Sequence, residues 1–573
     1  MINKDEEENN NHTIKIEAVV LNPERNSFEN KLRKAYSKED VSQNFEVLNE
    51  TKIISWENLL YETILPIHDF SNITDADILN EKYKDINDIK TKKIIYGDIE
   101  RTRVQESIYM KSFKDYVFQI IIYYINKNNI PYKQGLNEIV GPFVLLKYKL
   151  NLTFTRIYKL LVCFIDKYLT NYFRENDFFS LKSTFSLINL LLRYHDPQLF
   201  YIFEYYTILP ELYATSWIMT LFSNKCSLNP LYYLWDKLIL FDDNLFSIFF
   251  IVSMLILNRE NFLKGDSTLI LSFLSQMEIR DIDNINGILN KANQIRDKTP
   301  NSFYLLANKV EIFNYESKEL KNLFEKYKPD KMLALPMFPN EIFCITQKNI
   351  KGCPNKKCQN FLKNEKCSDL SKCIFCRNKQ IQRKIAYIIL DIRIFNDENV
   401  KENILSSEFF PGFLPKTLRI TKEQLEDDNF PNNIITEYKN EKDNYHFIII
   451  TSETDYFEQY ENDFYKVKRI STKKLNCFYK SYKVLDYVKV NEKFKDHSKK
   501  EYFLLKEYDN FKKLIEEMNK EGFKYVSFIY GGYKLIHYYA MEYKIDLLGH
   551  GSNCFLCEEE KKQKNNFSFF KFW

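Results

Sequence analysis

Two short stretches of the chain combine residue types that could act together on a phosphoryl group. In the first, Asp98 precedes Arg101 by three positions, and in the second Tyr132 is followed by Gln134 and Gly135. A guanidinium has a permanent charge and a planar fork of donors, so Arg101 could stabilise negative charge on phosphoryl oxygens. A carboxamide can donate to and accept from one water molecule, which would let Gln134 orient an attacking nucleophile. Because 33 positions separate the two side chains, a fold must bring them together.

These stretches resemble the two finger motifs of the TBC domain, which stimulates GTP hydrolysis by Rab-type small GTPases. The family motifs read I-x-x-D-x-x-R and Y-x-Q-G, and both are complete here, beginning at Ile95 and Tyr132. The resemblance implies that Arg101 stabilises the transition state inside the GTPase and that Gln134 positions the water. The residues that it implies as supports of the two loops are Asp98, Thr102, Tyr132, Gly135 and Asn137. The plainer alternatives are a surface ion pair on a helix and an ordinary loop before a helix.

Further stretches match the same family and predict its helical scaffold. Trp56 lies where the family carries G-x-R-x-x-x-W, although the Gly is missing and Lys52 replaces the Arg. Later matches surround Asp196-Pro197, Trp217 and Trp235. We expect both tryptophans to pack in the core. We also expect Asp196 to cap a helix that begins at Pro197.

Apolar residues that recur at helical spacing predict an all-α domain over residues 36–315, which the resemblance implies is a TBC domain. The predicted helices cover residues 113–128, 136–147, 155–173, 180–195, 198–206, 245–257, 267–276, 283–297 and 303–311. Residues 1–35 are polar and are expected to be disordered, and residues 316–340 are expected to form a linker.

After the linker, short apolar runs alternate with helical segments, which predicts an α/β domain with a mainly parallel sheet over residues 341–550. The runs lie at residues 341–344, 386–390, 447–450 and 525–530, and the helical segments at residues 506–521 and 533–543. The chain is thus expected to be multidomain, with an all-α domain followed by an α/β domain.

This second half resembles the rhodanese domain. The stretches that carry the resemblance are Leu390–Arg393, Phe410–Pro415 and Gly531-Gly532. An active rhodanese needs a cysteine in the loop after its central strand, whereas Thr451–Asp455 contain none. The resemblance therefore implies a rhodanese-like fold without sulfurtransferase activity, and we expect structural roles for Asp391 and Arg393. The combined order resembles the TBC-domain protein-kinase-like subgroup, here without the kinase half.

Cysteines gather in a Lys/Asn-rich insertion at residues 351–380 and again near the end of the chain. The spacing C-x2-C occurs in both places and is typical of zinc ligands. The candidate ligands are Cys353, Cys358, Cys373 and Cys376, with Cys554 and Cys557 as an alternative pair near His550. One zinc could also be shared by Cys373, Cys376, Cys554 and Cys557, or the cysteines could be thiols of a disordered insertion. Residues 551–573 are expected to form a C-terminal tail.

The composition excludes some classes of protein. The chain of 573 residues carries 82 basic and 78 acidic side chains, so its net charge of +4 gives no argument for binding nucleic acid. The apolar run Leu245–Leu257 has 13 residues, fewer than the roughly 18–20 that a membrane span needs. Residues 1–14 lack the apolar core of a signal peptide, and eleven cysteines without one favour a reducing compartment. We therefore expect a cytoplasmic protein.

The resemblance to the TBC family implies an activator of a Rab-type GTPase in vesicle trafficking, which we expect at the periphery of endosomal or Golgi membranes. GTP and Mg²⁺ would belong to the GTPase, so no catalytic cofactor is expected here, and zinc is the candidate structural metal. The alternative is a non-catalytic adaptor or tether that binds a Rab GTPase. In either case the rhodanese-like domain could recruit vesicle-tethering proteins.

Overall fold

The structure is a computed structural model of residues 1–573, and it describes only part of that chain. The described residues are 48–64, 70, 72–81, 89–104, 112–169, 172–174, 178–310, 332–346, 385–393, 410–427, 429–452, 499–554 and 556–557. The predicted disordered segment at residues 1–35 and the Cys-rich insertion at residues 351–380 lie outside these ranges.

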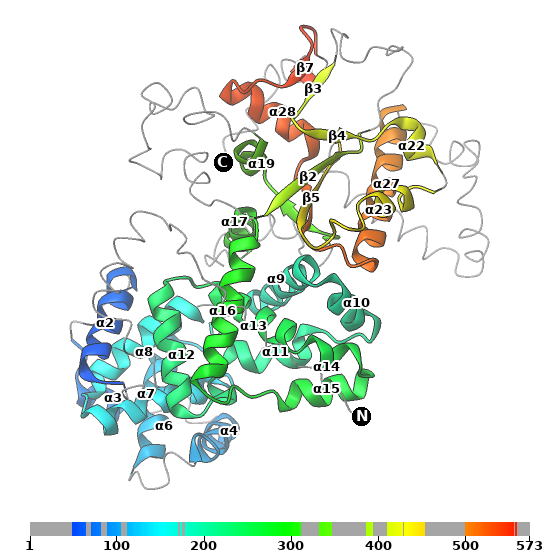
Figure 1. The fold of residues 1–573 in the computed structure, drawn as a ribbon. Coiled ribbons are helices and arrows are strands. Elements are labelled where there is room, and N and C mark those ends of the chain that lie inside the picture. The colour runs from blue at the N-terminus through cyan, green and yellow to red at the C-terminus, as the bar shows by residue number, and fades with distance from the viewer. Residues whose placement is uncertain are drawn as a thin grey trace, which may run out of the picture. The chain divides into compact units, whose positions relative to one another are not determined.

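The described residues between positions 48 and 310 form a helical region, drawn from blue to green in Figure 1. Its helices are α2 (Glu50–Ile64), α3 (Asp75–Leu79), α4 (Ile89–Glu100), α6 (Phe113–Asn128), α7 (Leu136–Leu150), α8 (Phe154–Tyr168), α9 (Phe179–His195), α10 (Pro197–Tyr205), α11 (Pro210–Met219), η3 (Ser223–Lys225), α12 (Leu228–Phe241), α13 (Phe246–Leu257), α14 (Arg259–Leu263), α15 (Ser267–Gln276), α16 (Ile282–Lys298) and α17 (Asn301–Val310). The predicted helices agree with these within about three residues at each end, except that α8 ends at Tyr168 and the helix predicted there extends to residue 173. Asp196 caps α10 as expected, since its side chain accepts a hydrogen bond from the Leu199 amide and Pro197 occupies the first turn.

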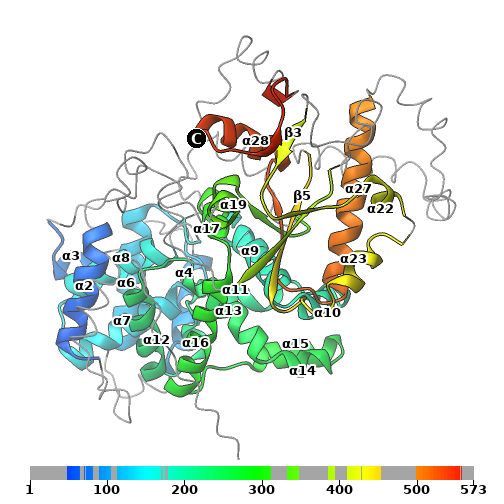
Figure 2. The same ribbon diagram turned by 45° about the horizontal axis from the view of Figure 1, so that its top comes forward.

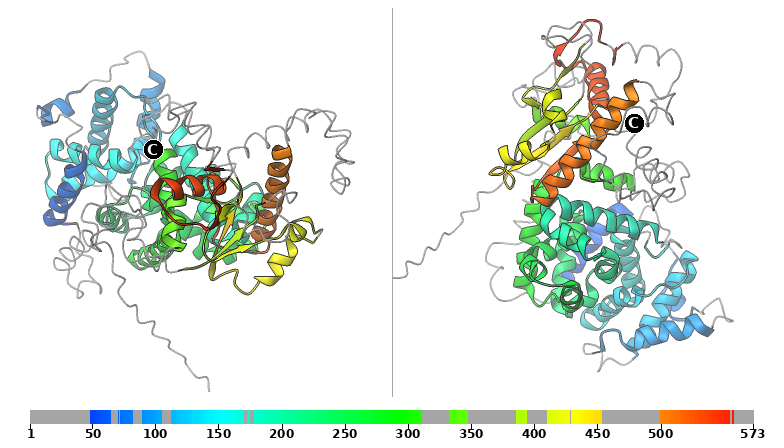
Figure 3. Two further views of the ribbon diagram at one scale, coloured as in Figure 1. Left: turned by 90° about the horizontal axis from the view of Figure 1, so that it is seen from above. Right: turned by 90° about the vertical axis from the view of Figure 1, so that its right-hand side faces the viewer.

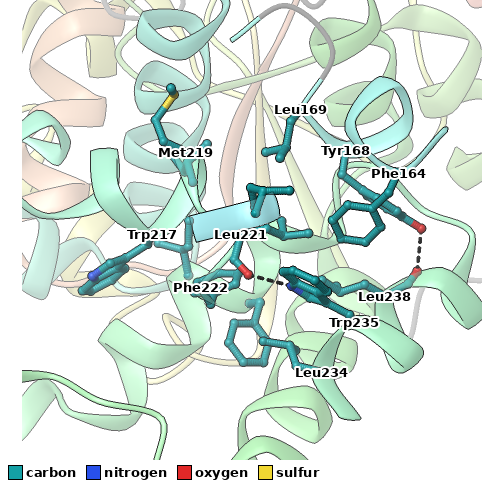
Figure 4. Packing of buried hydrophobic residues seen from close by; sticks show 14 of the residues in the cluster. Phe164, Tyr168, Leu169, Trp217, Met219, Leu221, Phe222, Leu234, Trp235 and Leu238 are labelled. Atoms are coloured by element: carbon teal, nitrogen blue, oxygen red, sulfur yellow. Dashed lines mark hydrogen bonds between the residues drawn. The ribbon is translucent and has the colours of Figure 1, made fainter. Parts of the chain in front are cut away.

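Aromatic side chains fill the core of the helical region. Trp56, Trp217 and Trp235 are fully buried, as the sequence predicted for the last two. The indole N–H of Trp56 donates to Asp236 at 2.9 Å, and that of Trp235 donates to the Leu221 carbonyl at 3.0 Å, the second contact being visible in Figure 4. The indoles of Trp56 and Trp235 therefore keep a hydrogen-bond partner while their rings supply apolar area to the core.

The remaining described residues form an α/β region. Its elements are β1 (Leu335–Met337), α19 (Pro339–Thr346), β2 (Ala386–Asp391), β3 (Pro411–Phe413), β4 (Thr417–Arg419), α22 (Lys422–Glu426), α23 (Asn432–Glu437), β5 (Tyr445–Ile450), α27 (Lys499–Lys520), β6 (Val526–Ile529), α28 (Gly532–Tyr543) and β7 (Leu548–His550). Five strands form a parallel sheet in the order β1-β6-β5-β2-β4, and β3 pairs with β7 in a separate antiparallel ladder. A mainly parallel sheet is what the alternation of apolar runs and helical segments predicted.

Alternate residues of β5 enter two different cores, one on each face of the sheet. Ile448 and Ile450 pack with α19 and α28, whereas Phe447 and Ile449 pack with α22, α23 and α27. Figure 2 shows α27 and α28 on opposite sides of the strands, and Figure 3 shows α27, in orange, beside the yellow strands. Burial on both faces explains why this strand is a continuous apolar run in the sequence.

The structure differs from the prediction at the start of this region. Residues 341–344 were expected to be a strand but belong to helix α19, because four apolar residues alone do not distinguish a strand from a buried helix. The sheet begins earlier, with Leu335–Met337, inside the segment that the sequence analysis assigned to a linker. Pro336 suggested a break in that segment, yet the residue sits in an edge strand, where proline is tolerated.

Described residues of the helical and α/β regions also contact one another. The Tyr525 amide donates to the Tyr194 carbonyl at 2.7 Å, and the two rings lie edge to face. The carboxylate of Glu341 accepts hydrogen bonds from the Asn301 and Ser302 amides at 3.1 and 3.0 Å, at the start of α17. The beginning of α17 is therefore capped by a side chain from α19.

Candidate functional site

The buried carboxylate of Asp98, near the end of α4, holds the Arg101 side chain. Arg101 donates from its guanidinium to one carboxylate oxygen, and the Tyr132 hydroxyl donates to the other at 2.8 Å. The Asp98 side chain is 3% exposed, whereas the Arg101 side chain is 65% exposed. The buried Asp98 carboxylate thus orients the Arg101 guanidinium, which remains open to solvent.

Asn137, at the start of α7, links the two predicted finger loops. Its amide nitrogen donates to the Thr102 hydroxyl at 2.8 Å, and its oxygen accepts from the Gly135 amide at 3.1 Å. The Thr102 hydroxyl donates in turn to the Asp98 carbonyl at 2.9 Å. All of the predicted supporting residues therefore join one hydrogen-bonded network between the loop after α4 and the loop before α7.

Gln134 is exposed, while the residues on both sides of it are anchored. The Lys133 ammonium donates to the Tyr172 carbonyl at 2.8 Å and lies 4.3 Å from the centre of the Phe178 ring. Gly135 has a φ of +106°, a conformation that residues with a Cβ rarely adopt, and it is the N-cap residue of α7. Contacts on both sides of Gln134 therefore hold this loop, and Gln134 itself is exposed to solvent.

Burial, and then the hydrogen bond to Asp98, raise the pKa of Tyr132 far above its usual value. Its hydroxyl therefore keeps its proton at physiological pH and acts as the donor to the Asp98 carboxylate. Since one Asp98 oxygen is engaged by Tyr132, the other oxygen is directed to Arg101.

A second arginine, Arg103, lies two residues after Arg101 and is buried rather than exposed, which the sequence did not predict. Arg103 is buried, and its guanidinium donates to the backbone carbonyls of Ser223 and Cys226, the latter at 2.7 Å. Its backbone has a positive φ of 48°. The spacing of the motif from Asp98 selects Arg101 rather than Arg103. In the structure the guanidinium of Arg103 already binds protein carbonyls, so it is not available to a partner.

Gly141 permits close packing beneath the network. A Cβ at this position would lie 2.8 Å from the Thr102 methyl carbon, shorter than ordinary van der Waals contact. The absence of a side chain at Gly141 therefore lets α7 approach the loop that carries Arg101.

The α/β region contains an Asp–Arg pair of a different kind. Arg393 and Asp391 form an ion pair in which both side chains are 2% exposed, and the guanidinium lies 3.5 Å from the centre of the Tyr533 ring. Arg393 also donates to the Gly412 carbonyl at 3.1 Å. These contacts support the structural role that the sequence predicted for both residues.

The predicted metal ligands fall into two groups. Cys353, Cys358, Cys373 and Cys376 lie outside the described residues. Cys554 and Cys557 are described, and their sulfur atoms lie within 4.8 Å of the ring nitrogens of His537 and His550. The sequence analysis noted His550 and missed His537.

A cavity of about 380 Å³ lies beside α10 and α16 and includes none of the finger residues in its lining. Basic side chains outnumber acidic ones in this lining, and they include Arg259, Lys298 and Lys442. Burial, followed by the charges of nearby lysines including Lys298, lowers the pKa of His195 well below its usual value. The His195 imidazole is therefore neutral, and its Nε2 lies 2.8 Å from the Thr299 hydroxyl.

Comparison with known proteins gives the class of the helical region. Residues 55–263 match the family model described as the Rab-GTPase-TBC domain. The chain therefore contains a TBC domain, as the two motifs predicted, and this domain includes both finger loops. Within the described ranges, no helix combines the length and the apolar character that a bilayer crossing demands.

Several named proteins share this domain. The human "TBC domain-containing protein kinase-like protein" is 28% identical over 116 residues, which cover 20% of this chain and 13% of that protein. The human "TBC1 domain family member 13" is 29% identical over 195 residues, which cover 32% of this chain and 47% of that protein. Each alignment thus spans less than half of the relative's length. The crystal structure of the Ypt/Rab-GAP domain of Gyp1p aligns with 47% of this chain and 98% of its own, at 18% identity and a TM-score of 0.36.

Proposed function

We propose that this protein accelerates GTP hydrolysis by a Rab-type small GTPase, with Arg101 and Gln134 as the two residues that enter the GTPase site. Arg101 would stabilise the charge that develops on the transferred phosphoryl group, and Gln134 would orient the attacking water. GTP and Mg²⁺ would be held by the GTPase. The proposed setting is vesicle trafficking, on the endosomal or Golgi membranes to which the target Rab is attached.

The observation that carries this proposal is the exposed guanidinium of Arg101 above the buried carboxylate of Asp98. An arginine that acts in another protein must be accessible, and its approach costs less entropy when its direction is already set. The shared network through Asn137 supports the joint action of Gln134, because it connects the loops that carry the two side chains. An arginine supplied in trans contributes about 10³–10⁵-fold in turnover.

The test is single-turnover GTP hydrolysis by a panel of purified Rab proteins with and without this chain. We expect acceleration of at least one Rab, and loss of that acceleration in Arg101→Ala and Gln134→Ala. The matched control is Arg280→Ala, which removes an exposed arginine outside both motifs and should leave the rate unchanged. Full acceleration by the Arg101→Ala protein would refute the proposed mechanism. Binding of a Rab·GTP complex without acceleration would favour the alternative of a non-catalytic adaptor.

For the α/β region we propose a non-catalytic rhodanese-like module that recruits vesicle-tethering proteins. The position after β5 is occupied by Thr451 and Ser452, and both the amide and the hydroxyl of Ser452 donate to the Glu507 carboxylate. A serine hydroxyl has a far higher pKa than a thiol and cannot carry a persulfide. We therefore expect no cyanide transfer from thiosulfate, and measurable transfer by the purified chain would contradict this assignment.

A further inference from the structure

Four side chains that can ligate metal meet at one end of the α/β region. His537 lies in α28 and His550 ends β7, while Cys554 and Cys557 follow in the next turns of the chain. His537 and Cys554 are fully buried, and the other two are partly buried. No disulfide involves either of these two described cysteines. The Nε2 and Sγ atoms, which are the atoms that would bind a metal, point toward one another rather than outward.

The separations of these atoms match a tetrahedral metal site. Typical bonds to zinc of about 2.3 Å for sulfur and about 2.0–2.1 Å for nitrogen require N···N distances of about 3.3 Å and N···S distances of about 3.6 Å at tetrahedral angles. The two Nε2 atoms are 3.1 Å apart, and His537 Nε2 lies 3.4 Å and 3.5 Å from the sulfurs of Cys554 and Cys557. His550 Nε2 lies 3.5 Å from the Cys557 sulfur. These four distances agree with the expected values within about 0.2 Å.

Hydrogen bonding among the four groups cannot account for this convergence. His537 Nε2 is close to three ligating atoms at once, yet a ring nitrogen carries either one hydrogen or one lone pair. It can therefore form one of these three hydrogen bonds at a time. A cation at the centre would bind all four atoms together, with the two thiol protons released to solvent.

We propose that His537, His550, Cys554 and Cys557 bind one structural Zn²⁺ ion. Two thiolates and two imidazoles in a tetrahedral arrangement favour zinc among the common metals. Because the protein supplies all four ligands, no position is open for water or substrate, and the ion is structural rather than catalytic. The set is complete without Cys373 and Cys376, which distinguishes it from the shared site considered in the sequence analysis.

The ion would fasten the segment after β7 to α28. Cys554 and Leu556 already belong to the core on this face of the sheet, and the Gly551 amide donates to the Phe410 carbonyl at 2.9 Å. Residues 551–557, which the sequence analysis placed in the tail, would thus be an integral part of the α/β region. This inference concerns a different region from the proposed Rab-directed activity and does not depend on it.

The first experiment measures bound zinc per chain by mass spectrometry after purification without added metal. We expect Cys554→Ser/Cys557→Ser to lose one zinc relative to the unaltered chain. The matched control is Cys226→Ser, which alters a buried cysteine of the helical region and should leave the zinc content unchanged. Equal zinc in the unaltered chain and the double variant would overturn the proposal.

The second experiment separates this site from the insertion and does not require a ligand variant to fold. The zinc-loaded chain carries serine in place of Cys353, Cys358, Cys373 and Cys376, and X-ray absorption reports the ligands. We expect one zinc with two sulfurs at about 2.3 Å and two nitrogens at about 2.0–2.1 Å. Loss of all zinc from this variant, or a shell of four sulfurs, would overturn the four-residue site.

Discussion

The helical and α/β regions each contain an aspartate that binds a nearby arginine, and the two pairs differ in exposure. Arg101 is 65% exposed above Asp98, whereas Arg393 is 2% exposed beside Asp391. Arg393 also binds the Gly412 carbonyl and stacks on the Tyr533 ring. The first guanidinium can therefore reach another molecule, and the second already has its partners within the protein.

This difference separates a residue that acts on a partner from a residue that stabilises the fold. A buried ion pair is strongly coupled to the structure around it, because removing one member leaves an uncompensated charge. In the Arg101 pair only Asp98 is buried, and its carboxylate keeps the hydrogen bond from the Tyr132 hydroxyl when Arg101 is replaced, so we expect a small effect on stability. Substitutions at the two positions should thus have opposite effects on activity and on stability.

The largest expected effect is on the stimulated rate. Arg101→Ala should lower Rab GTP hydrolysis by about 10³–10⁵-fold, which corresponds to about 4–7 kcal/mol of barrier. Its thermal unfolding should remain close to that of the unaltered chain, because the guanidinium is exposed. Single-turnover hydrolysis and a denaturation scan measure the two quantities. A large loss of stability would show that Arg101 is part of the fold, as Arg393 is.

Arg393→Ala provides the converse test. It leaves the Asp391 carboxylate buried without its cation, so we expect the α/β region to lose about 3–5 kcal/mol of stability. Denaturant unfolding monitors this loss, and Arg393→Lys is the conservative control that keeps the charge. Stimulated hydrolysis per folded molecule should not change. A fall in that rate with intact folding would mean that the α/β region takes part in the reaction.

A smaller effect is expected beneath the finger loops. Gly141→Ala introduces a Cβ 2.8 Å from the Thr102 methyl carbon, and such overpacking costs about 1–3 kcal/mol. The matched control is Gly287→Ala in α16, where a Cβ would meet nothing within 4 Å. That change should stabilise its helix by up to about 1 kcal/mol. Equal unfolding free energies for the two variants would contradict the close packing of α7 on this loop.

The smallest effect concerns His195, a buried imidazole whose pKa is lowered by burial and by nearby lysines. Because the folded pKa of His195 is lowered, the folded protein disfavours its protonation, whereas the unfolded chain protonates it near pH 6.5. The contribution of His195 to the free energy of unfolding is therefore fully present above about pH 6.5. It declines as the pH falls below that value, by at most about 1.4 kcal/mol per pH unit. Unfolding free energies measured between pH 7 and pH 5 should show a shallower slope for His195→Gln than for the unaltered chain.

The helical region could be predicted closely because its signals are local and repeated. Long apolar periodicities gave α9, α15 and α16, and the Asp196-Pro197 pair marked the start of α10. The finger motifs marked both loops, since the family spaces these residue types closely along the chain. The α/β region was harder, because α19 contributes only a short apolar run that either a helix or a buried strand could contain.

The residues that were missed depend on contacts between distant parts of the chain. Arg103 binds carbonyls more than a hundred positions away, so the residues next to it in the sequence do not indicate that it is buried. His537 lies 17 positions before Cys554 and within a helix whose pattern suggests only packing. The roles of Arg103 and His537 could be recognised only in the folded structure, because their partners are set by tertiary contacts rather than by spacing along the chain.

The lengths of the strands have a consequence for solubility. The outer strands β1 and β4 have three residues each, whereas the inner strands β2 and β5 have six, and Pro336 removes an amide donor from β1. Edge strands of three residues, one of which contains a proline, give a neighbouring chain little backbone to pair with. The sheet can therefore keep its long apolar strands at the centre without exposing a template for aggregation.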